Sequence, residues 1–349
     1  MTHIALLCVR NEGAFLLEWL AHHRAVGFDN FVVFSNTCDD GTDAMLDHLQ
    51  DLGLVHHIRN DGPYDKRGIQ FTALKAAAKL DVVKGATWIL PLDVDEFVNI
   101  HAGDHTLDAL HTALPDATAI TLTWRLFGSA GRLRYEDTPL LDSFTRCAPK
   151  IMHWSWRAAM FKTLYRNDGT YTKPGVHRPR DPDREKLQRA RWFDGAGREL
   201  TERFKTQRIF SDYGQDNYGL VQLNHYPLGS LESYLLKADR GRAVHGTDML
   251  GMDYWVERNF NTDTDTSIQA LAPTRRAQLD HLMSDAILAE LHQKAVAWRK
   301  VRFDTLMKLD PFRALFGRLL MTPPSQPLDR AAAQFLLHHA HLAHQSDPQ

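Results

Sequence analysis

Two aspartates, Asp93 and Asp95, are the residues of this sequence best suited to chemistry. They lie in Leu92-Asp93-Val94-Asp95-Glu96-Phe97, directly after the apolar run Trp88-Ile89-Leu90. Residues two apart on a strand point to the same face, so we expect the two carboxylates side by side at the end of a buried strand. Such oxygen ligands suit Mg²⁺ or Mn²⁺ and leave coordination positions for phosphate oxygens. The segment predicts a metal site that neutralises a departing diphosphate, although a turn capped by either aspartate would also explain it.

Two further polar segments follow apolar runs nearer the start of the chain. Arg10-Asn11-Glu12 comes after residues 4–9, and Ser35-Asn36-Thr37-Cys38-Asp39-Asp40-Gly41-Thr42 comes after residues 31–34. Asn, Asp and Gly form turns readily, so turn formation alone would account for both segments. Ligands of parallel sheets bind beyond the carboxyl ends of the strands, so the same residues are also placed to surround a nucleoside.

The segments that must position these residues alternate between strand and helix patterns. Strands are predicted at 4–9, 31–34, 54–58 and 87–94, and helices at 15–26, 42–52 and 69–80. Continuously apolar strands separated by helices of this length indicate an α/β fold, with a mostly parallel sheet covered on both faces. Pro91 is unusual for a central strand and predicts a bulge or a strand end.

The rest of the chain has a different character. Residues 146–208 contain 16 Lys and Arg against 7 Asp and Glu, which predicts either a solvated basic surface or a site for an anionic ligand. Residues 291–321 show a helical pattern that Pro311 interrupts, followed by a short helix at 328–344 with a solvated, histidine-rich end. The two longer helices either pack on the body or present a basic amphipathic face to an anionic membrane. We divide the chain into 1–125, 126–285 and a helical extension at 286–349.

Composition excludes several classes of protein. With 349 residues, 44% hydrophobic and 24% charged, the chain is not disordered, collagen-like or a coiled coil. A net charge of -2 gives no general attraction to nucleic acid. The three cysteines, Cys8, Cys38 and Cys147, have no CxxC spacing and exclude a disulfide framework and a thiolate zinc site. No secretory signal or membrane-spanning segment is recognised, so we expect a cytoplasmic protein, with contact at the inner face of a membrane as an option.

Five motifs in order along residues 4–265 resemble those of a glycosyltransferase family 2-like group related to the family 92 galactosyltransferases. They are Val9-Arg10-Asn11-Glu12 with Leu17-Glu18-Trp19-Leu20-Ala21-His22-His23 and Gly27-Phe28-Asp29; Asn36 with Asp40-Gly41-Thr42; Trp88 with Leu92-Asp93-Val94-Asp95-Glu96-Phe97; Trp124-Arg125-Leu126-Phe127-Gly128-Ser129-Ala130-Gly131; and Asn224-His225-Tyr226 with Ser230, Lys237 and Arg240-Gly241. Gly229 stands where the group carries a lysine before the serine.

The resemblance implies a GT-A fold, which is a nucleotide-binding αβα sandwich with a DxD-bound divalent cation. It implies transfer of a sugar, with inversion, from a nucleotide-sugar that is most often UDP-linked. The acceptor is expected to be a glycan or glycolipid, in the synthesis of a surface polysaccharide. The cofactor is expected to be Mn²⁺ or Mg²⁺, and the oligomeric state is left open.

The resemblance also assigns roles to residues. The predicted metal ligands are Asp93, Asp95 and a distant histidine, His225. Alternatively, His225 is a core histidine whose hydrogen bonds are satisfied within the protein. The predicted base is Asp142, where Ser143 replaces the group's following basic residue, and Glu136, Asp137 and Asp212 are the alternatives that the sequence does not separate from it. The predicted nucleotide-sugar-binding residues are Arg10, Asn11, Glu12, Asn36, Asp40, Arg67, Asp93, Lys237 and Arg240.

Two other functions remain open at the level of sequence. One is a metal-dependent phosphotransferase or nucleotidyltransferase that uses the same carboxylate pair, although no Walker A lysine loop is present. The other is a carbohydrate-binding protein on the same scaffold that has lost catalysis. The intact Asp93 and Asp95 argue against the second function, whereas Gly229 and Ser143 leave it open.

Overall fold

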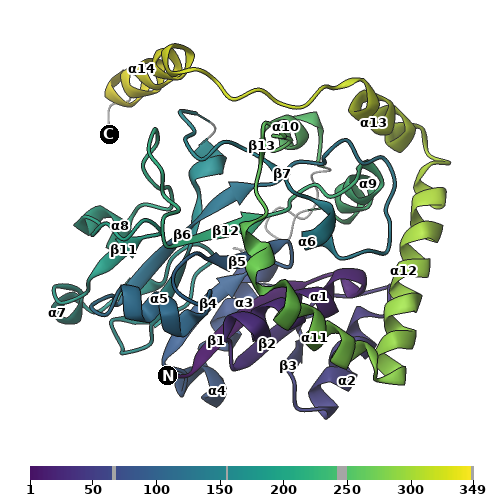
Figure 1. The fold of residues 1–349 in the computed structure, drawn as a ribbon, viewed down its shortest axis with the longest axis horizontal. Coiled ribbons are helices and arrows are strands. Elements are labelled where there is room, and N and C mark those ends of the chain that lie inside the picture. Colours follow the sequence, from purple (N-terminus) through teal and green to yellow (C-terminus); the bar gives the residue numbers. More distant parts are fainter. Residues whose placement is uncertain (65–67, 155, 242–249, 347–349) are drawn as a thin grey trace.

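The computed structural model describes residues 1–349 except 65–67, 155, 242–249 and 347–349, and it contains one large central sheet (Figure 1). The strand order is β3-β2-β1-β4-β8-β6-β12-β5, and β11 pairs with β6. Strands β3, β2, β1 and β4 are mutually parallel, whereas β8 and β5 run antiparallel to their neighbours. The bounds are β1 His3–Val9, β2 Asn30–Ser35, β3 His56–Arg59, β4 Trp88–Leu92, β5 Glu96–Ile100, β6 Ala119–Leu126, β8 Phe161–Arg166, β11 Trp192–Asp194 and β12 Val221–His225.

Each face of this sheet carries its own hydrophobic core. In β1, Ala5 and Leu7 belong to one core, while Ile4 and Leu6 belong to the other. Helices α1 (Gly13–Val26), α2 (Thr42–Asp51), α5 (Leu107–Ala113) and α11 (Ala272–Met283) contribute to the first core. Helices α3 (Ile69–Ala77), α4 (Asp81–Lys84) and α8 (Glu202–Thr206) contribute to the second. This two-sided burial explains why the strands read as continuous apolar runs, and it confirms the predicted αβα sandwich.

Two strands differ from the prediction at their ends. The third strand is His56–Arg59 rather than 54–58, and none of its four residues is fully buried at this edge of the sheet. The fourth strand ends at Leu92, before the first aspartate. Pro91 lies inside that strand, but β8 pairs with β4 only at Trp88 and Ile89. One edge of the strand is therefore open at Pro91, where a proline is tolerated.

The boundary predicted at residue 125 does not interrupt the fold. Strand β6 crosses it, and the core formed on the α1 face extends from Ala5 to Leu288. The shorter elements are α6 Leu140–Ser143, β7 Arg146–Cys147, the 3₁₀ helix η1 Trp156–Ala159, β9 Tyr171–Lys173, β10 Arg180–Pro182, α7 Arg184–Leu187, β13 Asp263–Thr264 and the 3₁₀ helix η2 Ser267–Leu271. All three cysteines are free thiols.

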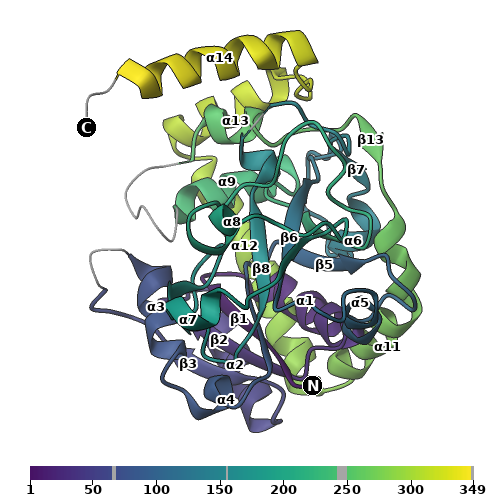
Figure 2. The same ribbon diagram turned by 90° about the vertical axis from the view of Figure 1, so that its left-hand side faces the viewer.

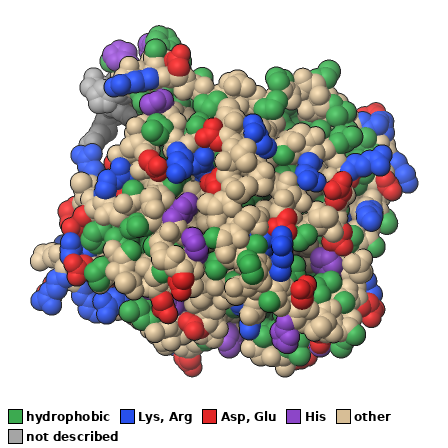
Figure 3. Space-filling view, viewed as in Figure 1, with side chains coloured by type: hydrophobic (Ala, Val, Ile, Leu, Met, Phe, Trp, Pro, Cys, Tyr) green, Lys and Arg blue, Asp and Glu red, His purple; other side chains and the backbone are tan. Residues whose placement is uncertain are grey.

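The basic segment 146–208 is largely paired with acids. Arg191 contacts Asp116 and Glu199, and Arg198 contacts Asp194. On the face in Figure 3, acidic and basic side chains are interspersed, and Lys and Arg gather at the lower left, over α7. Of the residues of this segment that the structure describes, only Arg157, Val176 and His177 line the large cavity described below. Most of the segment is therefore solvated surface, and a small part reaches the site.

The C-terminal helices follow the predicted pattern. They are α9 Leu231–Arg240, α10 Met252–Val256, α12 Ala286–Leu306, α13 Asp310–Met321, which has Pro311 at its start, and α14 Arg330–Ser346. Helix α12 runs along the body and buries Ala295 and Val296 against Ala14 of α1. Gly13 permits this contact, because a Cβ there would lie 2.9 Å from the Ala295 Cβ. Helix α14 lies across the top of the molecule, apart from the sheet, in both views (Figures 1 and 2).

In the part of the chain that the structure describes, no helix combines the length and the apolar character needed to cross a bilayer.

Candidate active site

Two adjoining cavities lie beyond the carboxyl ends of the parallel strands. The larger cavity has about 1430 Å³ of space and takes its lining from the loops after β1, β2 and β4, from the end of β12 and from α9. The smaller cavity has about 670 Å³ and lies between these strand ends, α9 and α12. Five residues line both cavities and form their shared wall: Glu12, Val94, Asp95, Lys237 and Arg240. This is the edge of the sheet where the sequence placed a ligand.

The two aspartates lie in a turn between β4 and β5 and not on a strand. The alternation argument for their proximity was therefore wrong, because β4 ends one residue before Asp93. Both carboxylates nevertheless line the larger cavity, and only Asp95 also lines the smaller one. The turn gives the two acids different neighbours, and those neighbours separate their roles.

Asp93 accepts hydrogen bonds from two neighbouring side chains. Its Oδ1 accepts a hydrogen bond from Gln70 Nε2 at 2.9 Å, and its Oδ2 accepts one from Lys162 Nζ at 2.9 Å. Lys162 is fully buried and also lies 3.5 Å from Glu96. Burial lowers the pKa of this lysine, but the two acids outweigh burial and raise its pKa above the usual range. Lys162 is therefore a fixed positive charge, and both oxygens of Asp93 already have partners.

Glu96 holds the turn in place through hydrogen bonds. Its Oε1 accepts a hydrogen bond from Trp124 Nε1 at 2.7 Å, and its Oε2 accepts one from the backbone N–H of Asp93 at 2.9 Å. The side chain has no exposed surface, and burial raises the pKa of Glu96 well above its usual value. A buried polar network with satisfied partners rigidifies its surroundings, so the first aspartate has little freedom to move.

Asp95 faces the cavities with a lysine and a histidine beside it. Lys237 Nζ donates to Asp95 Oδ2 at 2.6 Å and to the Pro227 carbonyl at 2.8 Å. His225 Nε2 lies 3.6 Å from Asp95 Oδ1. Burial acts to raise the pKa of Asp95, but the Lys237 ammonium outweighs it and lowers the pKa well below its usual range. Asp95 is therefore a carboxylate at any pH at which the protein works.

His225 is held in place by the sheet. It ends β12, pairs with Glu96 of β5, and its ring lies 4.2 Å from the ring of Trp124, centroid to centroid. Burial lowers the pKa of His225, so the imidazole is neutral, which is the form that binds a metal. The second ring nitrogen, Nδ1, is buried without a hydrogen-bond partner in the described structure.

Asp95 and His225 are close enough together that both could bind one divalent cation. Their 3.6 Å separation is too long for a hydrogen bond, whereas neighbouring ligands of an octahedral ion, each at about 2.1 Å, lie about 3 Å apart. Among the described residues, no group of three or more His, Cys, Asp or Glu side chains surrounds a single point. The protein thus offers two ligands, and Mg²⁺ or Mn²⁺ sites commonly complete their shell with substrate phosphates and water.

The loop after β1 joins the shared wall through Glu12. This side chain is 7% exposed and forms an ion pair with Arg240, which also donates to the Arg10 carbonyl at 2.8 Å. Burial and the neighbouring Arg299 lower the pKa of Arg240 to about 10, so it remains charged at neutral pH. Arg10 lines the larger cavity, whereas Asn11 lines only the smaller one.

The loop after β2 contributes one of its two predicted residues. Asn36 lines the larger cavity and ties the loops together, because it donates to the Val9 carbonyl and accepts from Asn60. Asp40 lines neither cavity. Its carboxylate accepts hydrogen bonds from the Gly13 N–H and from the N–H and hydroxyl of Thr42, so it organises the loops and is not placed to contact a nucleotide. Arg67 lies outside the described residues.

Asp142 is not where the base was predicted. Its carboxylate accepts hydrogen bonds from Arg275 at 2.6 Å and from Arg276 at 3.1 Å, and it lines neither cavity. A carboxylate held by two guanidinium groups away from the shared wall is a poor proton acceptor for a substrate there. Gly229, which replaces the expected lysine, lines the smaller cavity and adopts φ +61°.

Sequence reasoning missed several residues of the site. Lys162 had one signal, since it is a lysine inside the apolar run Met160 to Tyr165. Trp124 was part of a quoted motif but was given no role. Gln70, Trp298 and Arg299 gave no signal, because they reach the site from helices whose packing cannot be read from a single sequence.

Comparison with known proteins confirms the family resemblance. Residues 6–185 match the model of glycosyltransferase family 92. A glycosyltransferase family 92 protein of Ricinus communis is 27% identical over 112 residues, which is 31% of this chain and 19% of that protein. One of Oryza sativa subsp. japonica is 24% identical over 150 residues, which is 41% of this chain and 24% of that protein. The chain thus matches no more than about a quarter of the length of these relatives.

The comparison with solved structures gives two examples of proteins with a related backbone. Residues 1–349 of S. aureus TarS in complex with UDP-GlcNAc are 13% identical, with a TM-score of 0.35 and coverage of 82% of this chain and 74% of that one. Mannosyl-3-phosphoglycerate synthase from Rubrobacter xylanophilus is 16% identical, with a TM-score of 0.25 and coverage of 36% and 41%. At these TM-scores the similarity does not bear on function.

Proposed function

The chain belongs to glycosyltransferase family 92, and from that premise we propose that it transfers a sugar from a nucleotide-sugar donor, bound in the larger cavity, to an acceptor hydroxyl. The acceptor class proposed is a glycan or glycolipid, as in the synthesis of a surface polysaccharide. Fold alone hosts many chemistries, so the proposal depends on the arrangement of side chains at the shared wall.

The observation that carries the proposal is the meeting of Asp95, His225, Lys237 and Arg240 at one end of the larger cavity. A nucleotide-sugar carries a diphosphate, which needs positive charge both in the ground state and as it departs. Lys237 and Arg240 supply that charge from successive turns of α9 and bind phosphate oxygens with charge-assisted hydrogen bonds. A cavity of this size also has room for the nucleoside.

We propose that a divalent cation, Mn²⁺ or Mg²⁺, binds at Asp95 and His225 and there neutralises the departing diphosphate. Asp93 is assigned to the ribose or the donor sugar and not to the cation, since Gln70 and Lys162 occupy both of its oxygens. We propose UDP as the nucleotide, with Arg10 and Asn36 at the nucleoside end of the cavity.

The base we propose is Glu12. Among the described acids, only Glu12 and Asp95 line both cavities, and Asp95 is assigned to the cation. In the proposed step the acceptor oxygen forms a bond to the anomeric carbon while the bond from that carbon to the diphosphate oxygen breaks. The electron pair leaves with the nucleoside diphosphate, and the acceptor proton moves to Glu12. Attack opposite the leaving group inverts the anomeric centre.

The first experiment is thermal stabilisation by UDP, GDP and CMP, each with and without Mn²⁺. A ligand that binds only the folded state stabilises it by about 2.7 kcal/mol at 100 times its dissociation constant. We expect stabilisation by UDP that requires Mn²⁺, is lost in Asp95→Ala and is kept in the control Asp137→Ala, whose carboxylate binds His292 instead. No response to any nucleotide would leave the proposal without a donor site and favour a carbohydrate-binding protein.

Contact with a membrane and a cytoplasmic location stay predictions. The exposed apolar side chains Leu320, Met321 and Phe335 of α13 and α14 are the surface on which such a contact would be tested.

A further inference from the structure

We propose that the smaller cavity is the acceptor subsite and that it takes a saccharide carrying a negatively charged group, either a carboxylate or a phosphate. The proposal rests on the function proposed above and goes further, because it names where the acceptor binds and which chemical class of acceptor fits. It is carried by the position of the cavity, by Trp298 at its side and by the unpaired charge of Arg299.

The position of the smaller cavity suits an acceptor. It shares Glu12, Asp95, Lys237 and Arg240 with the larger cavity, so a molecule in each would meet at this wall. The base proposed for the reaction is part of that wall. An acceptor hydroxyl beside Glu12 would face a donor sugar held beyond Asp95, as direct transfer between two bound substrates requires.

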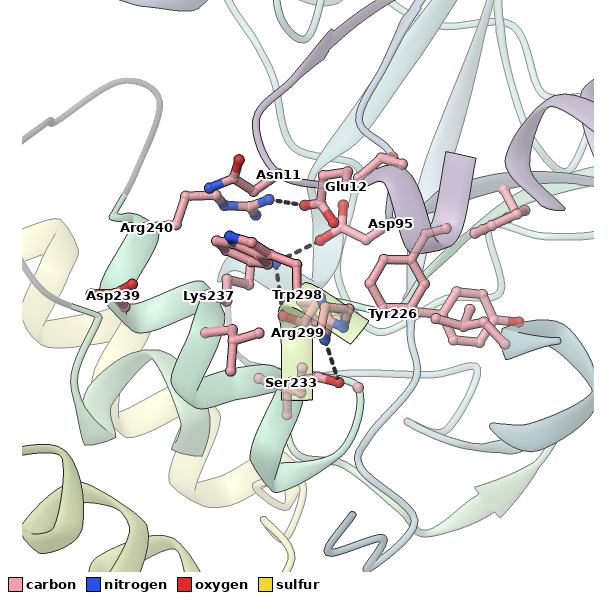
Figure 4. A pocket seen from close by; sticks show the side chains of 18 residues that line it. Asn11, Glu12, Asp95, Tyr226, Ser233, Lys237, Asp239, Arg240, Trp298 and Arg299 are labelled. Atoms are coloured by element: carbon pink, nitrogen blue, oxygen red, sulfur yellow. Dashed lines mark hydrogen bonds and ion pairs between the residues drawn. The ribbon is translucent and has the colours of Figure 1, made fainter. Parts of the chain in front are cut away.

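The lining of the smaller cavity suits a sugar ring. Phe15, Leu236 and Tyr226 form apolar walls, and Trp298 of α12 lies on the side where Lys237 and Arg240 also lie (Figure 4). Trp298 is only partly buried, which leaves indole surface available to a ligand. The C–H groups on one face of a pyranose pack well on such an aromatic surface, while its hydroxyls face the polar wall.

Among the described charged residues that line the smaller cavity, one cation has no ion-pair partner. Glu12 pairs with Arg240, Asp95 pairs with Lys237, and Asp239 pairs with Arg302. Arg299 remains. Within the described ranges no carboxylate lies at ion-pair distance from it, and its Nε is buried without a hydrogen-bond partner.

Arg299 is a buried cation that Asp40 and Glu232 compensate only from beyond ion-pair distance. It is 6% exposed, donates to Ser233 Oγ at 2.9 Å, and its guanidinium lies 4.6 Å from the ring centroids of both Phe15 and Tyr135. The two rings offset part of the cost of burying the cation. A buried cation normally has an anionic partner, and here the open side of the residue is the cavity. An anionic group on the acceptor would supply that partner.

Helix α12 holds Trp298 and Arg299 at fixed positions. Its first turn is capped by Asp285, which accepts from the N–H groups of Ile287 and Leu288. The contact of Ala295 with Gly13 then sets the helix against α1, one turn before Trp298. Two adjacent residues on a docked helix are better placed for selective recognition than residues on a loop.

The test compares three sugars on the protein loaded with UDP and Mn²⁺. Glucose, glucuronate and glucose 6-phosphate are titrated, and binding is followed by thermal shift and by ligand-observed NMR. We expect the two anionic sugars to bind about tenfold more tightly than glucose, as a charge-assisted hydrogen bond to a buried group implies. A preference for glucuronate or for glucose 6-phosphate identifies the anion as a carboxylate or a phosphate.

Variants separate the contributions. Arg299→Gln is expected to remove the tenfold preference, Arg299→Lys to keep most of it, and Trp298→Ala to weaken all three sugars about tenfold. Lys300→Gln, an exposed cation on the same helix, is the matched control and keeps the preference. UDP affinity with Mn²⁺ is measured for each variant and shows whether that variant has folded. If Arg299→Gln has not folded, Arg299→Lys is compared with the wild type in its place.

The outcomes are distinct. Equal binding of glucose and the anionic sugars, or a preference that survives Arg299→Gln, overturns the anionic class. Failure of all three sugars to bind a protein that binds UDP, or sugar affinities unchanged in Trp298→Ala, overturns the acceptor subsite. A protein that binds no nucleotide at all fails at the proposed function instead, before the acceptor is tested.

Discussion

The two cavities share one wall and differ in the residues that form the rest of their lining. The larger cavity takes its polar residues from strand ends, turns and α9, and its two aspartates, Asp93 and Asp95, pair with Lys162 and Lys237. The smaller cavity takes apolar residues from helix faces and contains a cation without an acid beside it. Strand ends present polar turn residues, whereas amphipathic helices present apolar stripes. The difference shows that strand ends position the carboxylates of the site, whereas α9 and α12 supply cations and apolar surface.

The largest effect is expected from a substitution of Asp95, a charged residue that lines both cavities. Asp95→Asn keeps the size of the side chain but leaves Lys237 without its anion and weakens the cation site. We expect transfer from a UDP-sugar to fall by about 10³-fold, as for loss of one strong stabilising group at a reacting centre. Turnover is measured by UDP release, with Asp137→Asn as a control outside both cavities. Activity within tenfold of the wild type would contradict the assignment.

Substitution of Glu12 separates the cavities by function. Glu12→Gln removes the proposed base while the amide still occupies the shared wall. We expect kcat to fall by about 10²-fold, the lower range for loss of general base catalysis, with UDP affinity changed little. Glu136→Gln, which removes an exposed partner of Arg132, should leave kcat unchanged. A Glu12→Gln variant that lost UDP binding instead would place Glu12 in donor recognition.

Lowering the pH should destabilise the fold around both cavities, because β5 lies against two buried histidines. His22 donates to the Val98 carbonyl of β5, and His23 stacks on Phe97. Burial lowers the pKa of His22 to about 3, against 6.5 for an exposed histidine. The unfolded chain therefore takes up a proton that the folded chain excludes, so the stability present above pH 6.5 is lost as the pH falls below it.

The size of this effect is testable. His22 alone should cost about 2 kcal/mol between pH 6.5 and 5.0, at about 1.4 kcal/mol per pH unit. Denaturant unfolding at pH 7.5 and pH 5.0 measures the loss, and His22→Gln should reduce it by that amount. A pH dependence identical in wild type and His22→Gln would show that this histidine is protonated in the folded protein.

The smallest effect on turnover is expected at Asp142, the acid outside both cavities. Asp142→Asn leaves the buried Arg275 with a weaker partner, which we expect to cost about 1 kcal/mol of stability. Transfer measured under saturating substrates should stay within about threefold of the wild type. If the rate of transfer fell as much as in Glu12→Gln, Asp142 would be the base. The argument that the base must line both cavities would then be wrong.

The sequence was sufficient for what local patterns determine. Apolar runs and helical periods located the sheet, its coverage on both faces and the break at Pro311, because burial on two sides leaves a direct trace in residue type. The motif around Asp93 and Asp95 was correctly placed at the ligand edge. Its geometry was not, because the strand ends at Leu92 rather than two residues later, and Pro91 alone indicated an early end.

What the sequence lacked was information on partners distant along the chain. Asp40 and Asp142 are acids in plausible motifs, and only the structure shows that their oxygens are used by Thr42 and by Arg275. Lys162 is 69 residues from Asp93, and Arg299 reaches the site from α12. A hydrogen bond of this kind depends on packing between elements, which leaves no periodic signal in one sequence.

The ion pair between Glu12 and Arg240 has a consequence for the order of events in a catalytic cycle. While the guanidinium holds the carboxylate, an acceptor that arrives first meets a base already engaged. A diphosphate competes for the same guanidinium, so arrival of the donor releases Glu12. Steady-state kinetics should therefore show ordered addition, donor before acceptor, with the nucleoside diphosphate as the last product to leave. UDP should then inhibit competitively against the donor and non-competitively against the acceptor.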